Sequence, residues 1–358
     1  MRFAYDTSYR DSRRLLRWRA DRAAYAVLVL LLLAAPFVLP VFYLGELTYL
    51  FIFALASLGL MVLTGYTGQV SLGHAAFIAI GAYAEALLLA RGWPLPASLA
   101  TASLLAGAAG LAIGMPAIRV SGLYLAMVTM AFAILVEHTL GHWSALTGGF
   151  TGMAVPDAKL FGISLATPTG FYFLCLAVLA AVLLALINLM RAHLGRAFVG
   201  VRDSEAAAWG LGIHVPRVKV QAFALSAAIT GLAGALLAHQ TKYLTPDGFG
   251  LMLSMQLVLA VVIGGLGSLR GAILGALLIG LLPAFISHLK PILPDRIAKQ
   301  FGLEIFVYGA VLVGFVLFEP MGLAGRWQKL RAFFESFPLY RRDTFRRAKT
   351  YMRSERHR

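Results

Sequence analysis

Long apolar runs alternate with short polar stretches along most of this sequence. Ten runs can be marked, at residues 24–43, 47–64, 70–90, 96–117, 122–139, 169–190, 219–240, 251–266, 271–289 and 303–320. Each is close to the ~20 residues with which a helix crosses the hydrocarbon core of a membrane. Backbone N–H and C=O groups in hydrocarbon must bond within their own segment, so such runs predict helices rather than open strands. The pattern therefore predicts an all-α, polytopic transmembrane bundle of about ten segments.

The third run begins irregularly. Residues 64–74 read "TGYTGQVSLGH", which is rich in glycine and in polar groups. Irregular backbone within a membrane is tolerated only where protein or water covers it. The stretch near 65–90 is therefore predicted to contain a broken or re-entrant helix.

Composition supports a membrane protein and excludes an ordinary soluble one. Hydrophobic residues make up 60% of the 358-residue chain and charged residues only 13%, and mean hydropathy is +0.80. A soluble chain of this length must present more charge to water, and would suggest two or three domains. Cys175 is the one cysteine, so a disulfide within the chain is impossible and a metal cluster is not expected.

Basic residues gather at the ends of the chain. The formal net charge is +15, but this does not indicate nucleic-acid binding, because the charge flanks a hydrophobic body. With the N-terminus inside and ten alternating segments, the inner stretches hold 25 of the 31 Lys and Arg residues. This bias predicts that the basic tails, 1–23 and 321–358, are cytoplasmic and contact membrane lipid, and that residues 24–320 form the transmembrane domain.

Sequence signatures of enzymes are missing. The chain contains no Walker A loop, HExxH, CxxC pair or GxSxG elbow. We therefore expect a protein that is not an enzyme, with no cofactor of its own and no metal site.

Some polar side chains lie within the apolar runs and are candidates for a substrate pathway. Polar and ionisable groups in a membrane are costly and often functional. The alternative to a role in transport is interhelical hydrogen bonding. For His74 this alternative is favoured. For Glu137, a position near a helix end, within reach of water, is an equally good explanation. The candidates are Gln69, Ser71, His74, Thr129 and Glu137.

The cytoplasmic loop 191–218 contains the stretch "RDSEAAAWGLGIHVPRVK", at residues 202–219. Acids and a serine suit a helix start, where they cap free N–H groups and match the dipole. The alanines that follow favour a short helix. Gly212 can end it through a left-handed turn. The small side chains of Ala206 and Ala207 predict a surface that docks in the groove of another protein, although an ordinary connector would also fit.

The same stretch resembles the EAA coupling loop of ABC importer permeases, in the form found in the M-type membrane subunit of Liv-type branched-chain amino-acid transporters. Leu211 stands where the general pattern has glycine, and Gly212 fits the Liv-type form. Further matching stretches follow in the expected order and cover most of residues 60–285: "GYTGQVSLGHAAFIAIGAYAEALL" (65–88), "RVSGLYLAMVTMAFA" (119–133), "TGGFTGM" (147–153), "AFALSAAITGLAGALLA" (222–238) and "AVVIGGLGSLRGAILGALLIGLLP" (260–283).

The resemblance implies a subunit of an ATP-driven, binding-protein-dependent importer in the bacterial inner membrane. It implies pairing with a homologous H-type permease, delivery of substrate by a periplasmic binding protein, and two cytoplasmic ATPase subunits that hold ATP and Mg²⁺. Branched-chain or other small neutral amino acids are the implied substrates. The residues assigned to ATPase coupling by the resemblance are Asp203, Glu205, Ala206, Ala207 and Gly212.

Two other classes of protein are considered. A self-contained channel or secondary carrier, for urea, amides or organic acids, would work without ATPase partners, but the halves of the sequence show no convincing inverted repeat. An intramembrane enzyme would need acids or histidines at helical spacing. Glu137 and His138 are sequence neighbours and do not share a helix face.

Overall fold

The computed structural model describes residues 19–157, 159–160, 163–164, 167–289, 303–319 and 321–336, and the account below concerns these residues. Long helices dominate them. They are α2 (Arg19–Val38), α3 (Val41–Leu60), α4 (His74–Ala90), α5 (Leu95–Ala117), α6 (Leu123–His142), α8 (Pro168–Arg191), α11 (Val215–Thr241), α12 (Leu251–Gly264), α13 (Leu269–Leu289) and α15 (Leu303–Phe318).

The connections contain shorter elements. The short helices are the π-helical η1 (Met61–Tyr66), α7 (Ser144–Thr147), the 3-10 helix η2 (Gly149–Thr151), α9 (His193–Asp203), α10 (Glu205–Gly210), the 3-10 helix η3 (Pro246–Phe249) and α16 (Gly322–Ser336). The strands are β1 (Met153–Ala154), β2 (Lys159–Leu160), β3 (Ile163–Ser164) and β4 (Tyr243–Leu244), with β1 antiparallel to β4 and β2 antiparallel to β3.

The predicted membrane segments are confirmed as helices. Seven stretches are long and apolar enough to cross a membrane, and α2, α4 and α15 contribute shorter apolar helices. The boundaries differ most for the first two runs. The first, predicted at 24–43, is α2 and ends at Val38. The second, predicted at 47–64, begins at Val41 and continues to Tyr66. Pro40 precedes Val41 and separates this helix from α2. The architecture is the all-α polytopic bundle that the hydrophobic pattern predicts.

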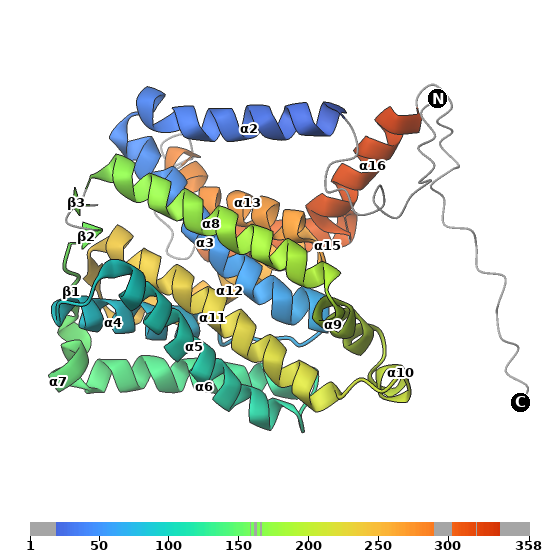
Figure 1. Ribbon diagram of the computed structural model, residues 1–358, viewed down its shortest axis with the longest axis horizontal. Coiled ribbons are helices and arrows are strands. Elements are labelled where there is room, and N and C mark those ends of the chain that lie inside the picture. Colours follow the sequence, from blue (N-terminus) through green and yellow to red (C-terminus); the bar gives the residue numbers. More distant parts are fainter. Residues whose placement is uncertain are drawn as a thin grey trace, which may run out of the picture.

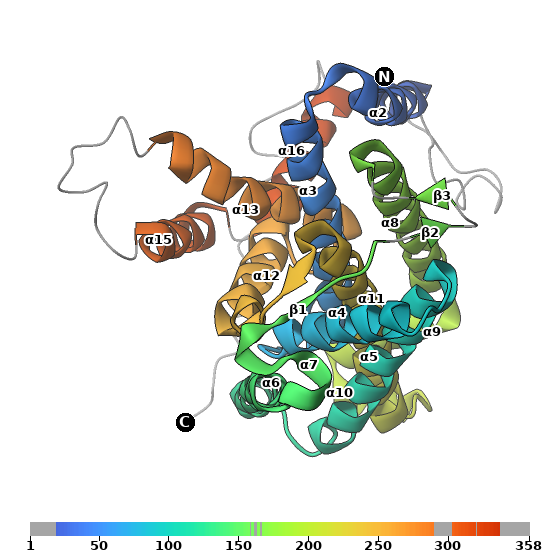
Figure 2. The ribbon, with the colours of Figure 1, turned by 90° about the vertical axis from the view of Figure 1, so that its left-hand side faces the viewer.

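The helices run between two ends of the bundle. In Figure 1, α9, α10 and α16 lie at the right-hand end, whereas α7 and β1 to β3 lie at the left-hand end. In Figure 2, α12, α13 and α15 lie on one side of α3, and α8 lies on the other side. The end that carries α9 and α10 is called the α10 end below, and the opposite end is called the β1 end.

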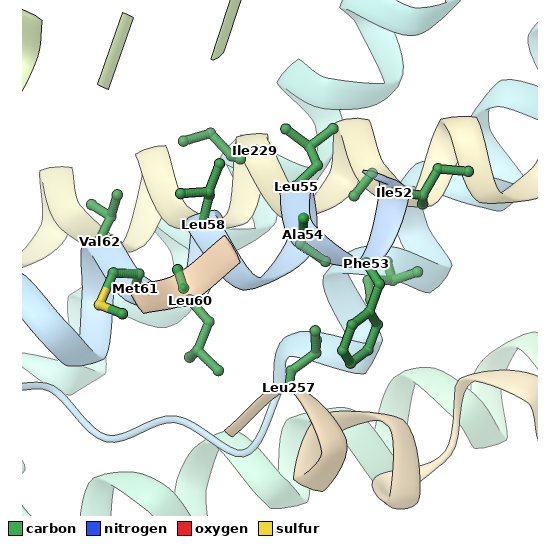
Figure 3. Packing of buried hydrophobic residues seen from close by; sticks show 14 of the residues in the cluster. Ile52, Phe53, Ala54, Leu55, Leu58, Leu60, Met61, Val62, Ile229 and Leu257 are labelled. Carbon is green, nitrogen blue, oxygen red and sulfur yellow. The ribbon is translucent and has the colours of Figure 1, made fainter. Parts of the chain in front are cut away.

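The centre of the bundle is built around α3 and α11. Most of α3 is buried. Figure 3 shows Leu55 and Leu58 of α3 on the side of Ile229 of α11, and Phe53 on the side of Leu257 of α12. Close helix contacts elsewhere depend on glycine. A Cβ built on Gly81 of α4 would overlap the backbone of Gly231 in α11, so these helices can approach closely only without side chains there.

The predicted break in the third membrane segment is confirmed. The chain leaves η1 at Tyr66, passes through residues 67–73, of which 68–73 are not helical, and enters α4 at His74. Because α4 has 17 residues, it is about 25 Å long at 1.5 Å per residue, which is shorter than the ~30 Å hydrocarbon core. Helix α4 therefore starts part of the way through the bundle, and residues 67–73 complete the crossing.

Candidate functional site

The loop between α8 and α11 forms two consecutive helices at the α10 end. Helix α9 ends at Asp203, and Ser204 then adopts an extended conformation, with φ −164° and ψ 115°. The Ser204 hydroxyl accepts a hydrogen bond from the Ala207 N–H at 3.2 Å and so caps α10. The predicted short helix is therefore present, and its cap is Ser204 rather than Asp203 or Glu205.

The C-terminus of α10 closes at Gly212, as predicted. Gly212 has φ +79°, and its N–H donates to the Trp209 carbonyl at 3.0 Å. The Ile213 N–H donates to the Ala208 carbonyl, also at 3.0 Å. This pair of hydrogen bonds is the Schellman pattern, in which a left-handed residue satisfies the last carbonyls of a helix. The chain then turns directly into α11.

Two ion pairs fix the acidic residues of this loop. The Lys219 Nζ of α11 lies 2.7 Å from a Glu205 carboxylate oxygen, and the Lys219 side chain is buried. Arg202 contacts the Asp203 carboxylate at 2.9 Å. Glu205 therefore anchors α10 to α11 within the chain, which the sequence reasoning did not predict.

The outer surface of α10 is small and apolar. Ala206, Ala207 and Gly212 are exposed, as the docking prediction requires. Trp209 is 54% exposed and Leu211 is 81% exposed. The Trp209 ring lies 5.7 Å from the His214 ring. Sequence reasoning missed these two side chains, because an apolar residue in a membrane protein does not by itself indicate a protein-binding surface.

The candidate pathway residues at the break belong to a buried hydrogen-bond chain. His74 Nδ1 lies 3.0 Å from the Ser71 hydroxyl, and Nε2 lies 2.8 Å from the Ser226 hydroxyl. Ser226 in turn donates to the Gly59 carbonyl at 2.6 Å. Because Ser226 uses its proton there, it accepts from His74, which places a proton on His74 Nε2. His74 thus joins the break to α3 and α11.

Two further candidates, Thr129 and Gln69, lie at the same break. The Thr129 hydroxyl accepts from the Leu72 N–H at 3.0 Å and donates to the Ala126 carbonyl at 2.9 Å. Gln69 donates to the Thr67 hydroxyl at 3.0 Å, and its own side-chain oxygen has no partner in the described structure. The structure therefore brings Gln69, Ser71, His74 and Thr129 together, with every side chain buried. Their role in a substrate pathway stays a prediction.

The fifth candidate lies elsewhere. Glu137 follows Thr129 by eight residues on α6, which places it about 12 Å further along the helix. A Cβ on Gly250, at the start of α12, would lie 3.5 Å from a Glu137 carboxylate oxygen. The carboxylate thus lies close to the N-terminus of α12, where the helix dipole favours negative charge.

A second buried polar cluster joins α4, α5 and α11. One oxygen of the Glu85 carboxylate accepts from the Ser98 hydroxyl at 2.7 Å and lies 3.1 Å from His239 Nε2. The other oxygen, Oε2, has no partner in the described structure. The sequence marks Glu85 as an ionisable group in an apolar run, but its partners come from distant helices.

Neither a metal site nor a substrate-sized cavity can be assigned from these residues. Among the residues searched, no group of three or more His, Cys, Asp or Glu side chains could hold a metal ion. One small apolar cavity of about 10 Å³ lies between α3, α4, α11 and α12, lined by residues such as Phe53, Ile78 and Leu237. That volume is close to the minimum for a single water molecule, so this cavity does not accommodate an amino acid.

This chain is similar in sequence to known membrane transport proteins. The family described as "Branched-chain amino acid transport system / permease component" matches residues 42–317. The chain is 32% identical over 322 residues to the high-affinity branched-chain amino acid transport system permease protein LivM of Escherichia coli (strain K12), covering 83% of this chain and 73% of that protein. It is 27% identical over 294 residues to LivH of the same strain, covering 76% and 91%.

A third relative carries a different name. The chain is 29% identical over 267 residues to the autoinducer 2 import system permease protein LsrC of Enterobacter sp. (strain 638), covering 71% of each chain. No solved structure matches. The family match extends from the start of α3 almost to the end of α15 and includes the break, the α10 loop and the glycine contacts. The chain therefore belongs to the family of branched-chain amino acid transport system permease components.

Proposed function

We propose that this permease imports branched-chain or other small neutral amino acids as the membrane-spanning subunit of an ATP-driven, binding-protein-dependent transporter. The names of LivM and LivH support this substrate class. The name of LsrC shows that relatives of similar identity can serve another import system. Family membership does not favour the alternative of a self-contained channel or secondary carrier.

The proposed assembly has four kinds of component. The similarity to both LivM and LivH supports a heterodimer between this chain and a homologous H-type permease. Two cytoplasmic ATPase subunits would bind ATP and Mg²⁺, and a periplasmic binding protein would dock at the β1 end. We place the complex in a bacterial inner membrane, with both basic tails cytoplasmic, because the inner stretches hold 25 of the 31 basic residues.

The outer surface of α10 is the observation that best supports coupling to ATPase subunits. Ala206, Ala207, Trp209 and Leu211 form an exposed apolar face outside the hydrophobic body of the bundle. Apolar helix faces of this kind fit into grooves of partner proteins, with aromatic residues as frequent anchors. Asp203, Glu205 and Gly212 shape and orient this face. Closure of the ATPase subunits would displace α10 and, through α11, rock the bundle between outward-open and inward-open states.

A matched pair of tryptophan variants tests ATPase docking. Trp209 lies on α10 and is 54% exposed, whereas Trp93 lies in the turn between α4 and α5 and is 45% exposed. We expect Trp209→Asp to release the ATPase subunits during purification of the co-expressed complex, because an anchor is replaced by a charge. Trp93→Asp should retain them. ATPase content is measured by mass spectrometry, and uptake of leucine, isoleucine and valine is measured in liposomes.

The outcomes separate the parts of the proposal. Equal ATPase retention in both variants would show that α10 is an ordinary connector. Retention that differs as expected, together with no uptake of any branched-chain amino acid by the unmodified complex, would contradict only the proposed substrate class.

A further inference from the structure

Arg202 reaches from α9 to the end of η1, just before the break in the third membrane segment. Its Nη1 atom donates a hydrogen bond to the Gly65 carbonyl of η1 at 3.1 Å, between residues 137 positions apart in the sequence. The Gly65 carbonyl belongs to the last helical turn before residues 67–73. One side chain thus joins the loop that carries α10 to the irregular backbone of the bundle.

Asp203 holds the guanidinium in this orientation. A single carboxylate oxygen of Asp203 accepts from Arg202 Nε at 3.0 Å and from Nη2 at 2.9 Å. These two contacts leave Nη1 directed at Gly65. Both side chains are partly exposed, and exposed ion pairs contribute little to the free energy of unfolding. The position of the pair, between α10 and residues 61–73, is therefore more informative than its contribution to stability.

Glycines make room for the guanidinium. A Cβ on Gly68 would lie 3.1 Å from Arg202 Cγ, and one on Gly267 would lie 2.8 Å from Nη1. A Cβ on Gly65 would lie 2.8 Å from the Gly267 nitrogen. Residues 61–68 and the turn between α12 and α13 therefore approach the same side chain. A larger residue at Gly68 or Gly267 would press on the Arg202 side chain, and one at Gly65 would push residues 61–68 away from the turn between α12 and α13.

The contact between Arg202 and Gly65 connects α10, the proposed docking helix, to the segment that contains the candidate pathway residues. Arg202 is followed by Asp203, the Ser204 cap and α10, so a displacement of α10 moves the base of Arg202. Gly65 is followed by the segment that contains Ser71 and leads to His74, whose hydrogen bonds reach α3 and α11. No other described hydrogen bond or ion pair joins a side chain of α9 to residues 61–73.

We propose that Arg202 is a positioning residue that transmits the movement of α10 to the broken helix at 61–73. This inference rests on the proposed docking of ATPase subunits at α10. In this arrangement, Arg202 and Gly65 move as one unit during the transport cycle. Loss of the guanidinium leaves the docking face intact and disconnects it from the break.

The functional test compares Arg202 with a second arginine of α9. Arg196 is exposed, and its guanidinium donates to the Arg191 carbonyl at 2.9 Å instead of reaching η1. We expect Arg202→Ala to retain the ATPase subunits and basal ATP hydrolysis but to lose at least about tenfold in uptake per ATP hydrolysed. Arg202→Lys keeps the cation but lacks the planar fork, so it should lie between Arg202→Ala and the unmodified protein. Arg196→Ala should match the unmodified protein.

Two results would overturn the proposal. One is an uptake-to-hydrolysis ratio for Arg202→Ala equal to that of Arg196→Ala. The other is loss of the ATPase subunits from Arg202→Ala, which would make Arg202 part of the docking face. If Trp209→Asp retains the ATPase subunits, the docking proposal fails separately. Should Arg202→Ala not assemble, the same comparison is made with Arg202→Lys.

A distance measurement tests the connection without relying on docking. Spin labels are placed at Arg196→Cys and Val70→Cys in a Cys175→Ser background, because Arg196 and Val70 are both exposed. We expect one narrow distance distribution that is the same with and without a bound ATP analogue. Adding Arg202→Ala should broaden it. An unchanged distribution in the Arg202→Ala protein would show that Arg202 does not hold α9 and residues 67–73 together.

Discussion

The turn at Gly212 offers the sharpest test of the α10 loop, because steric and backbone effects can be separated there. Gly212 has φ +79°, and a Cβ built on it meets nothing within 4 Å. A substitution would therefore act within the chain through backbone conformation alone. We propose the series Gly212→Asn, Gly212→Ala and Gly212→Val.

The magnitudes follow from the left-handed conformation. Alanine in this region costs about 1–2 kcal/mol relative to glycine, whereas asparagine tolerates it better. A β-branched residue is a genuine outlier there, so valine should cost at least about 2 kcal/mol. Free energies of 1–2 kcal/mol correspond to factors of about 5–30 in an equilibrium. The population of complexes with a correctly placed α10 should fall in the order asparagine, alanine, valine.

The assay is retention of ATPase subunits on purification, followed by substrate-stimulated ATP hydrolysis in liposomes. Backbone strain predicts that Gly212→Asn is more active than Gly212→Ala, although asparagine is larger. A steric clash with the docked ATPase predicts the opposite order. If alanine outperforms asparagine, or if Gly212→Val behaves like the unmodified protein, the reasoning about the left-handed turn is wrong.

Gly210 supplies the matched control for this series. It also meets nothing within 4 Å, but it lies inside α10 and its φ is not positive. Gly210→Ala should leave coupling unchanged and favour the helix by up to about 1 kcal/mol. Impairment by Gly210→Ala would show that the docking groove admits no added methyl group on this face.

Two further predictions concern orientation and the break. Trp209→Cys should react with impermeant thiol reagents only from the cytoplasm and Trp93→Cys only from outside, in intact cells and inverted vesicles, since Cys175 is buried; the reverse pattern would contradict the charge-based topology. Thr129→Val should lower the unfolding temperature, because the partly buried Leu72 N–H loses its acceptor, at a cost of about 1–3 kcal/mol. Thr129→Ser should not, and equal unfolding temperatures for the two variants would contradict this role of the hydroxyl.

Local rules explain why so much of the fold is predictable. In hydrocarbon, each backbone N–H and C=O group must be satisfied within its own helix, so the length and hydropathy of a run predict a membrane segment without knowledge of its neighbours. The glycine and polar residues before His74 likewise predict the break. Gly212 predicts its own left-handed turn, because the preference for positive φ belongs to the residue itself.

The partners of the polar side chains could not be derived in this way. Ser204, Asp203 and Glu205 all suit a helix start. Ser204 is the cap in the folded protein, where Glu205 pairs with Lys219 of α11. The same limit applies to Trp209, whose exposure depends on where the bundle ends and not on its neighbours in the sequence.

Contacts between distant segments depend on tertiary structure alone. Arg202 meets Gly65 across 137 positions, and His74 meets Ser226 across 152. Each of these groups could bond to many polar atoms in an unfolded chain or in a different packing of the same helices. The sequence by itself determined which segments are helices, where one is broken and where α10 turns, because these are properties of single segments. The packing of α3, α9 and α11 decided which side chains connect them, because only packed helices place such atoms within hydrogen-bonding distance.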